Sequence, residues 1–544
     1  MKRKMLALIS VLLVLSLFTG CFSDTTSGGN KVLRIVSGGE PGSLHPSLAQ
    51  GTHESIILDH IFEGLMRRDE NGNLVEGVAE SYAVSEDKLT YTFTIRKDAK
   101  WSNGDSVTAE DFEYAWKHAL NPLTASDYSY QLYYMVGATE FNTYDLEKGS
   151  EEELKKLEDA VGVRALDERT LEVNLAQPTP FFLELCGFYT YYPIPKSVQE
   201  ENPDWANDGS THISNGPFEI VEWNHDESVV TSKNKKYYNK DKIKLDGIEF
   251  TILEDQNTEW QMYQSGELDI NNNLPPDVLG TLRAENNPEL IIAGDLATYF
   301  YRFNTTLQPF NNMKVRKALS MAIDREIIVE EVAQGGQIPA FGIVPFEIPD
   351  GNGDFREIGG DYFSEDLEEA KKLLAEGLAE EGMDSLNFTL LYNTQESHQK
   401  IAEAIQEMWR QLGVEITLEN TEFRVKIERE HALDYEVARA GWIGDYVDPN
   451  TFLDMFTSWS TQNDTGWTND EFDKFIEMAG NEFDANKRME YLHEAEAILM
   501  EELPIMPIYY YTRPRCEKPY VKDTFKVINR EVCLIYADIE DVEE

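Results

Sequence analysis

Three short segments of the chain alternate apolar and polar residues, and this period of two predicts half-buried β-strands. In residues 89–95 the odd positions are Leu, Tyr, Phe and Ile, whereas threonines fill most of the positions between them. Residues 171–175 and 414–418 show the same alternation. Each of these strands should bury one face and leave the other nearer to solvent.

Other segments space their apolar residues three and four positions apart, which predicts amphipathic helices. Residues 364–378 place three leucines and an alanine on one face, and Asp366 with an acidic residue three positions later is a helix-start signal. Residues 111–120 and 401–412 are further helix candidates, the second ending before Gly413. Because strands and helices are mixed along the whole chain, the expected fold class is α/β.

With 544 residues the chain is too long for one hydrophobic core, since single cores stop growing near ~250–300 residues. We therefore expect two or three folded units. Turn-rich clusters are the candidate boundaries, and four of them stand out: residues 68–77, 193–216, 349–360 and 513–519.

The amino-terminal segment has the pattern of an export signal. Three basic residues precede an apolar run, 5–18, which is shorter than the ~20 residues that a membrane span needs. The run ends Leu-Phe-Thr-Gly-Cys, as a bacterial lipoprotein cleavage site does, so residues 1–20 are predicted to be a signal peptide. Cys21 would then carry lipid, with residues 21–30 as a flexible tether. The alternative is a plain secreted protein with an unmodified Cys21.

The formal net charge is −51, from 48 basic and 99 acidic side chains. Nucleic acid and anionic lipid surfaces would be repelled by this field, so we expect neither as a partner. The charge is also consistent with a solubility device or a salty medium. Any bias toward cationic ligands should be modest, because the Debye length at physiological salt is only ~8 Å.

No metal-binding or catalytic motif in the sequence is complete. Cys186, Cys516 and Cys533 fit no metal spacing, allow at most one disulfide and are expected to be buried thiols. No zinc-protease helix motif, nucleophile elbow or phosphate-binding loop occurs. The unevenly spaced histidines 45, 53 and 60 make a poor metal set, and the calcium-like run 350–354 has Phe355 where the loop needs glycine. We therefore expect no catalysis, metal or cofactor.

Two segments carry a specific resemblance. Residues 98–112 (DAKWSNGDSVTAEDF), with the strand before them, resemble the signature of the peptide/nickel family of extracytoplasmic solute-binding proteins. Residues 437–449 (VARAGWIGDYVDP) are similar to the oligopeptide-binding branch of that family and bring a basic group, an indole and a carboxylate close together. Further similar runs are residues 310–325, 390–394 and 506–513, and the resemblance extends over essentially the whole mature chain.

The resemblance implies a two-lobed, periplasmic-binding-protein-like fold of type II with an extra inserted domain. The first lobe, domain I, would combine residues 31–62, 190–296 and 515–544. Domain II, inserted into it, would be residues 63–189, and the second lobe, domain III, residues 297–514. Ligand would be enclosed between the lobes by hinge closure.

The resemblance also implies how a peptide would be held. Asp445 matches the acid that pairs with the ligand's amino terminus. The remaining implied positions serve the ligand backbone, its carboxyl end or a pocket wall: Gly441, Trp442 and Ile443; Gln50, Gly51 and Thr52; Tyr128; Arg439 and His398; and Phe423. The chain departs from some relatives in two places, since Glu430 replaces a ligand-facing Arg and Ile443 with Ala297 replaces a disulfide.

The function implied is a monomeric, lipid-anchored, extracytoplasmic oligopeptide-binding protein that delivers short peptides to the membrane permease of an ATP-driven importer. It would work at a Gram-positive-type cell surface or in a periplasm. Alternatives are a narrower ligand (a dipeptide, a cell-wall or signalling peptide, or a nickel chelate) and, in another class, a secreted hydrolase, for which no nucleophile and base can be named.

Overall fold

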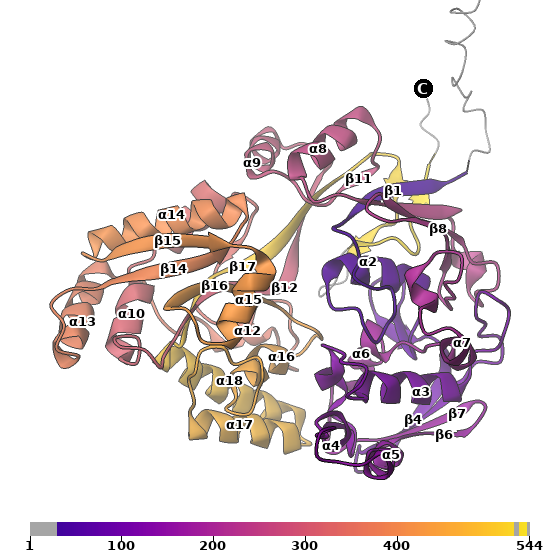
Figure 1. Cartoon of the computed structure of the whole chain (residues 1–544). Coiled ribbons are helices and arrows are strands. Elements are labelled where there is room, and N and C mark those ends of the chain that lie inside the picture. Colours follow the sequence, from indigo (N-terminus) through magenta and orange to yellow (C-terminus); the bar gives the residue numbers. More distant parts are fainter. Residues whose placement is uncertain (1–29, 527–531, 541–544) are drawn as a thin grey trace, which may run out of the picture.

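The chain forms two lobes joined by long strands (Figure 1), in a computed structural model that describes residues 30–526 and 532–540. The predicted signal peptide, and the tether with Cys21 up to residue 29, lie outside the described residues. None of the helices in the described part is both long enough and apolar enough to cross a membrane.

The first lobe contains two four-stranded sheets. One has the order β1-β10-β9-β8, in which β1 and β10 are parallel and the other pairs antiparallel: Val32–Gly38, Gly247–Ile252, Ser228–Lys233 and Phe218–Asn224. The other is wholly antiparallel with the order β4-β5-β7-β6: Ala79–Val84, Thr90–Ile95, Thr170–Asn174 and Val163–Asp167. The longer helices of this lobe are α2, Thr52–Ile61; α3, Ala109–Leu120; α5, Glu151–Ala160; α7, Lys196–Glu201; α8, Gln256–Ser265; and α9, Pro276–Glu285.

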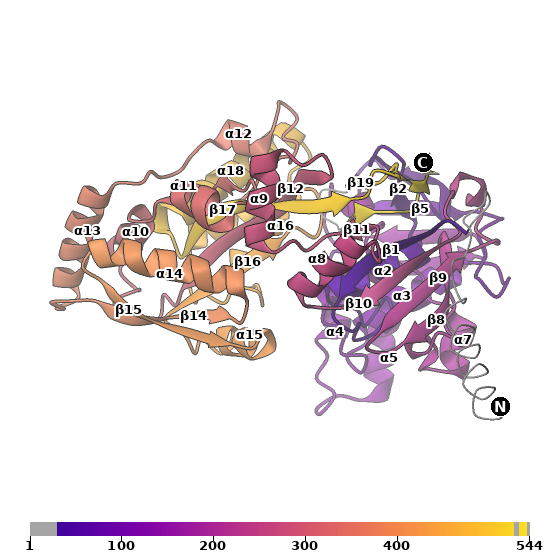
Figure 2. The same cartoon turned by 90° about the horizontal axis from the view of Figure 1, so that it is seen from above.

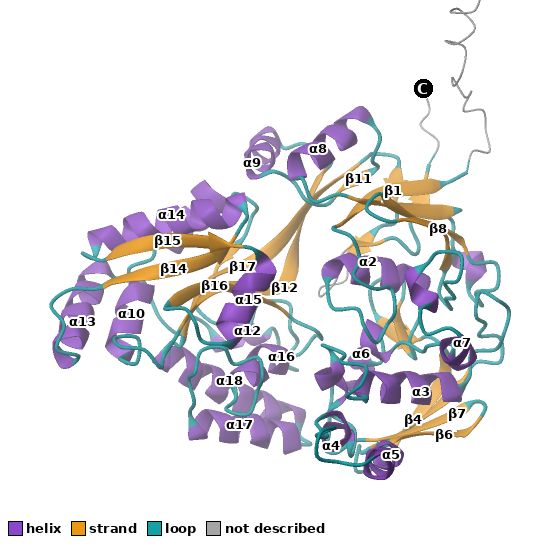
Figure 3. Cartoon of the chain, in the orientation of Figure 1, coloured by secondary structure: helices purple, strands orange, loops and turns teal. Residues whose placement is uncertain are grey.

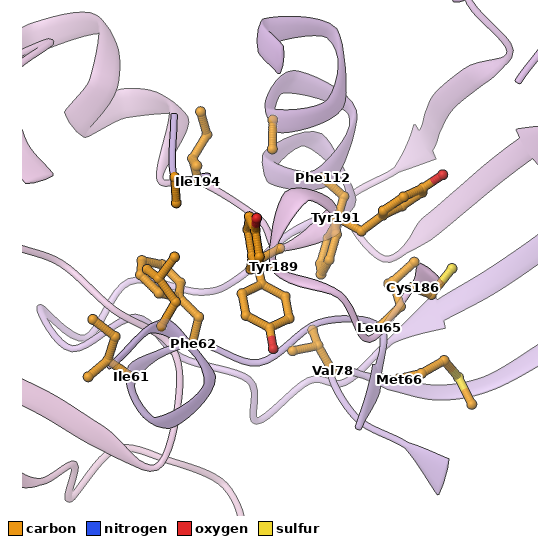
Figure 4. Close-up of a cluster of buried hydrophobic side chains, with 14 of the residues drawn as sticks. Ile61, Phe62, Leu65, Met66, Val78, Phe112, Cys186, Tyr189, Tyr191 and Ile194 are labelled. Atoms are coloured by element: carbon orange, nitrogen blue, oxygen red, sulfur yellow. The ribbon is translucent and has the colours of Figure 1, made fainter. Parts of the chain in front are cut away.

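One hydrophobic core extends through both parts of this lobe. Phe62 and Leu65, at and after the end of α2, pack in the same cluster as Tyr189 and Tyr191 of the one-turn helix η2, Tyr189–Tyr191 (Figure 4). The cluster reaches from Leu33 to the carboxyl-terminal residues up to Ala537. The segment predicted as inserted, 63–189, therefore shares a core with the rest of its lobe, and the division between domains I and II stays a prediction.

The second lobe is built on a mixed seven-stranded sheet. Its order is β11-β17-β12-β16-β14-β15, with β13 paired to β17: Ile270–Asn271, Ile505–Glu517, Leu290–Phe303, Val437–Ile443, Asn387–Asn393, Glu415–Thr421, and Ile338–Pro339 for β13. Successive residues of β12 point to opposite faces. Tyr299 and Tyr301 enter one hydrophobic cluster, and Phe300 between them enters another.

Helices cover both faces of this sheet (Figure 3). The cluster around Tyr299 includes residues of α10, Met313–Met321; α13, Leu367–Glu380; and α14, Glu396–Gln411. The cluster around Phe300 includes residues of α12, Phe355–Gly359; α16, Asn450–Leu453; α17, Asp470–Asn481; and α18, Ala485–Glu502. A further helix, α15, Phe423–His431, follows the edge strand β15.

Strands β12 and β17 connect the lobes (Figure 2). They have 14 and 13 residues and pair with each other along most of their lengths, while β17 also pairs with β11 toward the first lobe. The predicted boundaries 296/297 and 514/515 fall inside these two strands. The predicted turn cluster at 513–519 is wrong over its first five residues, because β17 continues to Glu517.

The predicted elements are otherwise confirmed. The three alternating segments are β5, β7 and β15, and the predicted helices are α3, α13 and α14. Asp366 caps α13 by accepting from the backbone N–H groups of Glu368 and Glu369. The start of α14 was predicted five residues too late, since its first turn is polar and exposed on most sides.

Candidate ligand-binding site

Strand β16 has an open edge in the second lobe. On one side it pairs with β12 along its whole length, from Val437 to Ile443. On the other side β14 pairs only with Val437 and Ala438. Within the described part of the chain, residues 439–443 thus have no strand on that side, and a strand edge without a partner can accept an extended chain.

Asp445 lies two residues beyond this edge and is half-buried. Its Oδ2 accepts a 2.6 Å hydrogen bond from Nε2 of Gln131 and a longer one, 3.4 Å, from the Tyr130 hydroxyl. Burial raises the pKa of the carboxyl to about 7, although these two hydrogen bonds oppose the rise. The group therefore changes charge near neutral pH in the absence of a cation.

Both donors to Asp445 come from the first lobe, where they lie on the one-turn helix η1, Ser129–Leu132. Tyr446 makes further contacts across the lobes: its ring stacks on Phe181 at 4.0 Å between centroids, and its hydroxyl lies 3.2 Å from that of Tyr134. The two lobes are thus in direct contact beside Asp445.

A second carboxyl, Asp454, belongs to the same region of the second lobe. Its Oδ2 accepts from Nδ2 of Asn450 at 2.9 Å and from the Tyr446 hydroxyl at 3.3 Å. Burial, with the nearby charge of Asp445, raises the pKa of Asp454 to about 7. A cation bound between the lobes would stabilise the ionised form of both carboxyls, so the pair favours a cationic ligand.

Arg439 stands at the opposite end of the open edge. Its guanidinium donates to the Tyr511 hydroxyl at 2.6 Å and lies over the Tyr299 ring, 4.6 Å from the centroid. No carboxylate of the described residues forms an ion pair with it, and its Nε is buried without a hydrogen bond. Gly441 leaves room beside it, because a Cβ there would lie 3.1 Å from the Tyr511 hydroxyl and 3.3 Å from the guanidinium and would push these groups aside.

His398 is buried beside the Tyr299 ring as well, and its Nδ1 lies 3.4 Å from the Tyr299 hydroxyl. Burial and the neighbouring Arg439 lower the pKa of its imidazole well below the ordinary value, so the ring is neutral. His398 can therefore offer a hydrogen bond to a ligand but no charge.

Glu430 is fully buried and forms an ion pair with Lys426, one turn earlier on α15. It therefore does not take over the ligand-facing role of the Arg in relatives. Its other close cation is Arg302, at 3.6 Å. The other predicted departure fits the structure, since Ala297 and Ile443 are direct cross-strand partners.

The remaining predicted residues lie on both lobes. Gln50 and Thr52 are exposed, and Gly51 is the extended N-cap residue of α2. The first backbone N–H groups of that helix have no partner within it. The half-buried Tyr128 packs against Tyr130, Phe188 and Tyr189.

On the second lobe, Phe423 is 60% exposed and Ile443 is 42% exposed. Trp442 is turned the other way and packs against the hydrophobic cluster around Phe300. The indole therefore packs within the second lobe, and its role at the site stays a prediction.

The structure adds four residues that the sequence did not indicate: Tyr130, Gln131, Tyr446 and Asp454. Tyr446 and Asp454 follow Asp445 closely, and their contacts depend on the way the chain turns after β16. Tyr130 and Gln131 follow Tyr128, but no pattern in the sequence points their side chains at a residue more than 300 positions away.

A two-lobed α/β fold with shared strands and an open strand edge between a guanidinium and a carboxylate defines a solute-binding protein of the clamp type. The comparisons with known proteins agree. The model of "Bacterial extracellular solute-binding proteins, family 5 Middle" matches residues 73–464. The chain belongs to this family.

Individual relatives match nearly end to end. The chain is 43% identical to the oligopeptide-binding protein OppA of Bacillus subtilis, over 89% of this chain and 88% of the relative. It is 39% identical to the dipeptide-binding protein DppE of the same organism, over 92% and 91%. Haemophilus influenzae OppA, solved in complex with the peptide RPPGFSPFR, superimposes with a TM-score of 0.81 at 31% identity, covering 94% of this chain and 99% of that one.

Proposed function

We propose that this protein captures short peptides between its lobes and delivers them to an ATP-driven membrane importer. The observation that carries the proposal is the open edge of β16. It runs from the guanidinium of Arg439, which no carboxylate of the described residues pairs with, toward the carboxyl of Asp445. A peptide has the complementary layout: an ammonium group, an extended backbone and a carboxylate.

The dimensions of the edge suit three or four residues. Strand residues advance ~3.3 Å each, so the backbone from Arg439 to Ile443 spans about 13 Å. A peptide that placed its amino group at Asp445 and its carboxylate at Arg439 would run antiparallel to β16. Its main chain would pair with the edge, and this pairing is independent of peptide sequence.

Side-chain tolerance follows from what surrounds the edge. Phe423 and Ile443 offer exposed apolar surface of no particular shape, while the charged anchors contact only the ends of the ligand. An edge of this length favours oligopeptides over dipeptides. Dipeptide binding remains the second candidate function, because the dipeptide-binding relative DppE is 39% identical to this chain.

The wider setting belongs to the same proposal. The protein would be anchored outside the cytoplasm by lipid on Cys21, would act as a monomer and would need neither catalysis nor a cofactor. Its relatives are solute-binding proteins, and several of them are described as periplasmic, which supports this setting.

Mass spectrometry of molecules that co-purify with the protein, released by acid or denaturant, tests the function directly. We expect peptides of about three to five residues with free amino termini. Recovery of nickel chelates or bile acids in their place, or cleavage of added peptides by the purified protein, would overturn the proposal.

A further inference from the structure

The hydrogen bond between Gln131 and Asp445 joins the two lobes at the predicted ammonium site. Gln131 is almost completely buried, with 2% of its surface exposed. Its backbone N–H donates to the carbonyl of Tyr128 at 3.1 Å, and its own carbonyl accepts from the Tyr191 hydroxyl at 2.6 Å. The backbone that carries this side chain is therefore fixed within the first lobe.

The donor on Gln131 is a neutral amide, and this distinguishes it from a competing cation. A carboxylate that accepts from an amide keeps its full negative charge, and the hydrogen bond stabilises the ionised form. Gln131 and Tyr130 both donate to the same oxygen of Asp445, Oδ2. The amide thus fixes the orientation of the carboxylate without neutralising it.

A purely structural role would look different. The lobes already meet through the Tyr446–Phe181 stack and through the hydroxyl pair of Tyr134 and Tyr446. These contacts hold the lobes together without touching Asp445. Gln131 and Tyr130, in contrast, donate hydrogen bonds to the carboxyl itself from the first lobe.

We propose that Gln131 is a positioning residue of the ammonium site, whose amide holds Asp445 from the opposite lobe so that lobe closure and capture of a peptide's amino group reinforce each other. The inference rests on the proposed function. In the open clamp Asp445 lacks this donor, and closure supplies it at the same moment as it encloses the ligand. Binding and closure are then coupled through one carboxylate.

The test uses Gln131→Met, which keeps the length of the side chain and removes the donor. Tri-, tetra- and pentaalanine are titrated into the full chain by calorimetry, and the tightest binder to the wild type is used throughout. At pH 7 we expect the variant to bind about 10-fold more weakly, as for one hydrogen bond to a charged group. The pH below which affinity declines should also rise, because Asp445 has lost a donor that favours its charge.

Two further variants separate the explanations. Tyr134→Phe removes a different contact between the lobes and should leave that pH unchanged. In an Asp445→Asn background, Gln131→Met should change affinity less than twofold. Equal loss in both backgrounds, or an unchanged pH profile in Gln131→Met, would overturn the positioning role and leave Gln131 as lobe packing. Failure of wild-type protein to bind any of the peptides would instead reject the proposed function, and the inference with it.

Discussion

Replacing Asp445 by Asn should affect binding and stability in opposite directions. The substitution removes one negative charge, keeps the shape of the side chain and leaves an amide oxygen to accept from Gln131. A ligand ammonium enclosed between the lobes would lose its charged partner, which typically costs ~2–5 kcal/mol. We therefore expect affinity for peptides with free amino termini to fall by about 30-fold to several thousand-fold at pH 8.

Stability should increase in the same variant. Burial raises the pKa of Asp445 from 3.8 to about 7, so ionising it opposes folding of the empty protein. For an acid whose pKa is raised by folding, this penalty is absent at low pH and grows as pH rises above the unfolded value, until it is complete above the folded one. At about 1.4 kcal/mol for each pH unit, the full penalty is up to about 4 kcal/mol, which Asn does not incur.

The assay is a pair of measurements on the full chain at pH 8: calorimetric titration with tetraalanine and urea unfolding of the ligand-free protein. The control is Asp448→Asn, which removes a carboxylate three residues away whose partner is Arg488, so peptide affinity should change little. A variant that kept wild-type affinity, or that was less stable than the wild type when empty, would refute the reasoning.

Three other outcomes are expected. Wild-type affinity should be highest between about pH 7 and 8, because below this range Asp445 takes up a proton and above it the peptide amino group, whose pKa is ~7.7–8.0, loses one; calorimetry from pH 5 to 9.5 checks this, and a flat profile contradicts it. Arg439→Met should weaken tri- and tetrapeptides about 10-fold or more but have little effect on their carboxyl-terminal amides; equal losses for both would mean that Arg439 does not meet the carboxylate. Burial lowers the pKa of His45 to about 3 and of His212 to about 4, so the folded chain resists protons that the unfolded chain takes up below about pH 6.5. Urea unfolding should therefore show stability falling as pH drops from 6.5 toward 4, with a slope about 1.4 kcal/mol per pH unit smaller in His45→Gln; an unchanged slope in that variant would contradict the expectation.

Local patterns were sufficient to predict much of the fold. The alternation in β5 and the capping residue of α13 report on a few neighbouring positions, and both were predicted correctly. The strand at Arg513–Glu517 was missed because proline and charged residues are typical of turns. In β17 its side chains are instead balanced by distant partners, such as Asp295 for Arg513.

The site was only partly predictable for the same reason. The run from Gly441 to Asp445 pointed to an acid beside a strand, and the structure places it there. The direction of Trp442, the neutralisation of Glu430 by Lys426 and the approach of Gln131 depend on packing between segments far apart in sequence. Pairings of this kind are determined by the tertiary structure and cannot be predicted from periodicity or composition.

The ribbon formed by β12 and β17 restricts how the clamp can move. Its pairing shifts register at two places: between Gly294 and Thr298, where residues 295–297 lie opposite Tyr511 alone, and between Tyr299 and Phe300. Torsion at residues 295 and 296, which precede the pairing of Ala297 with Ile443, would need changes in only a few backbone dihedrals. The lobes should thus rotate about one axis rather than swing freely, and a disulfide engineered across the first of these shifts would freeze the angle between them.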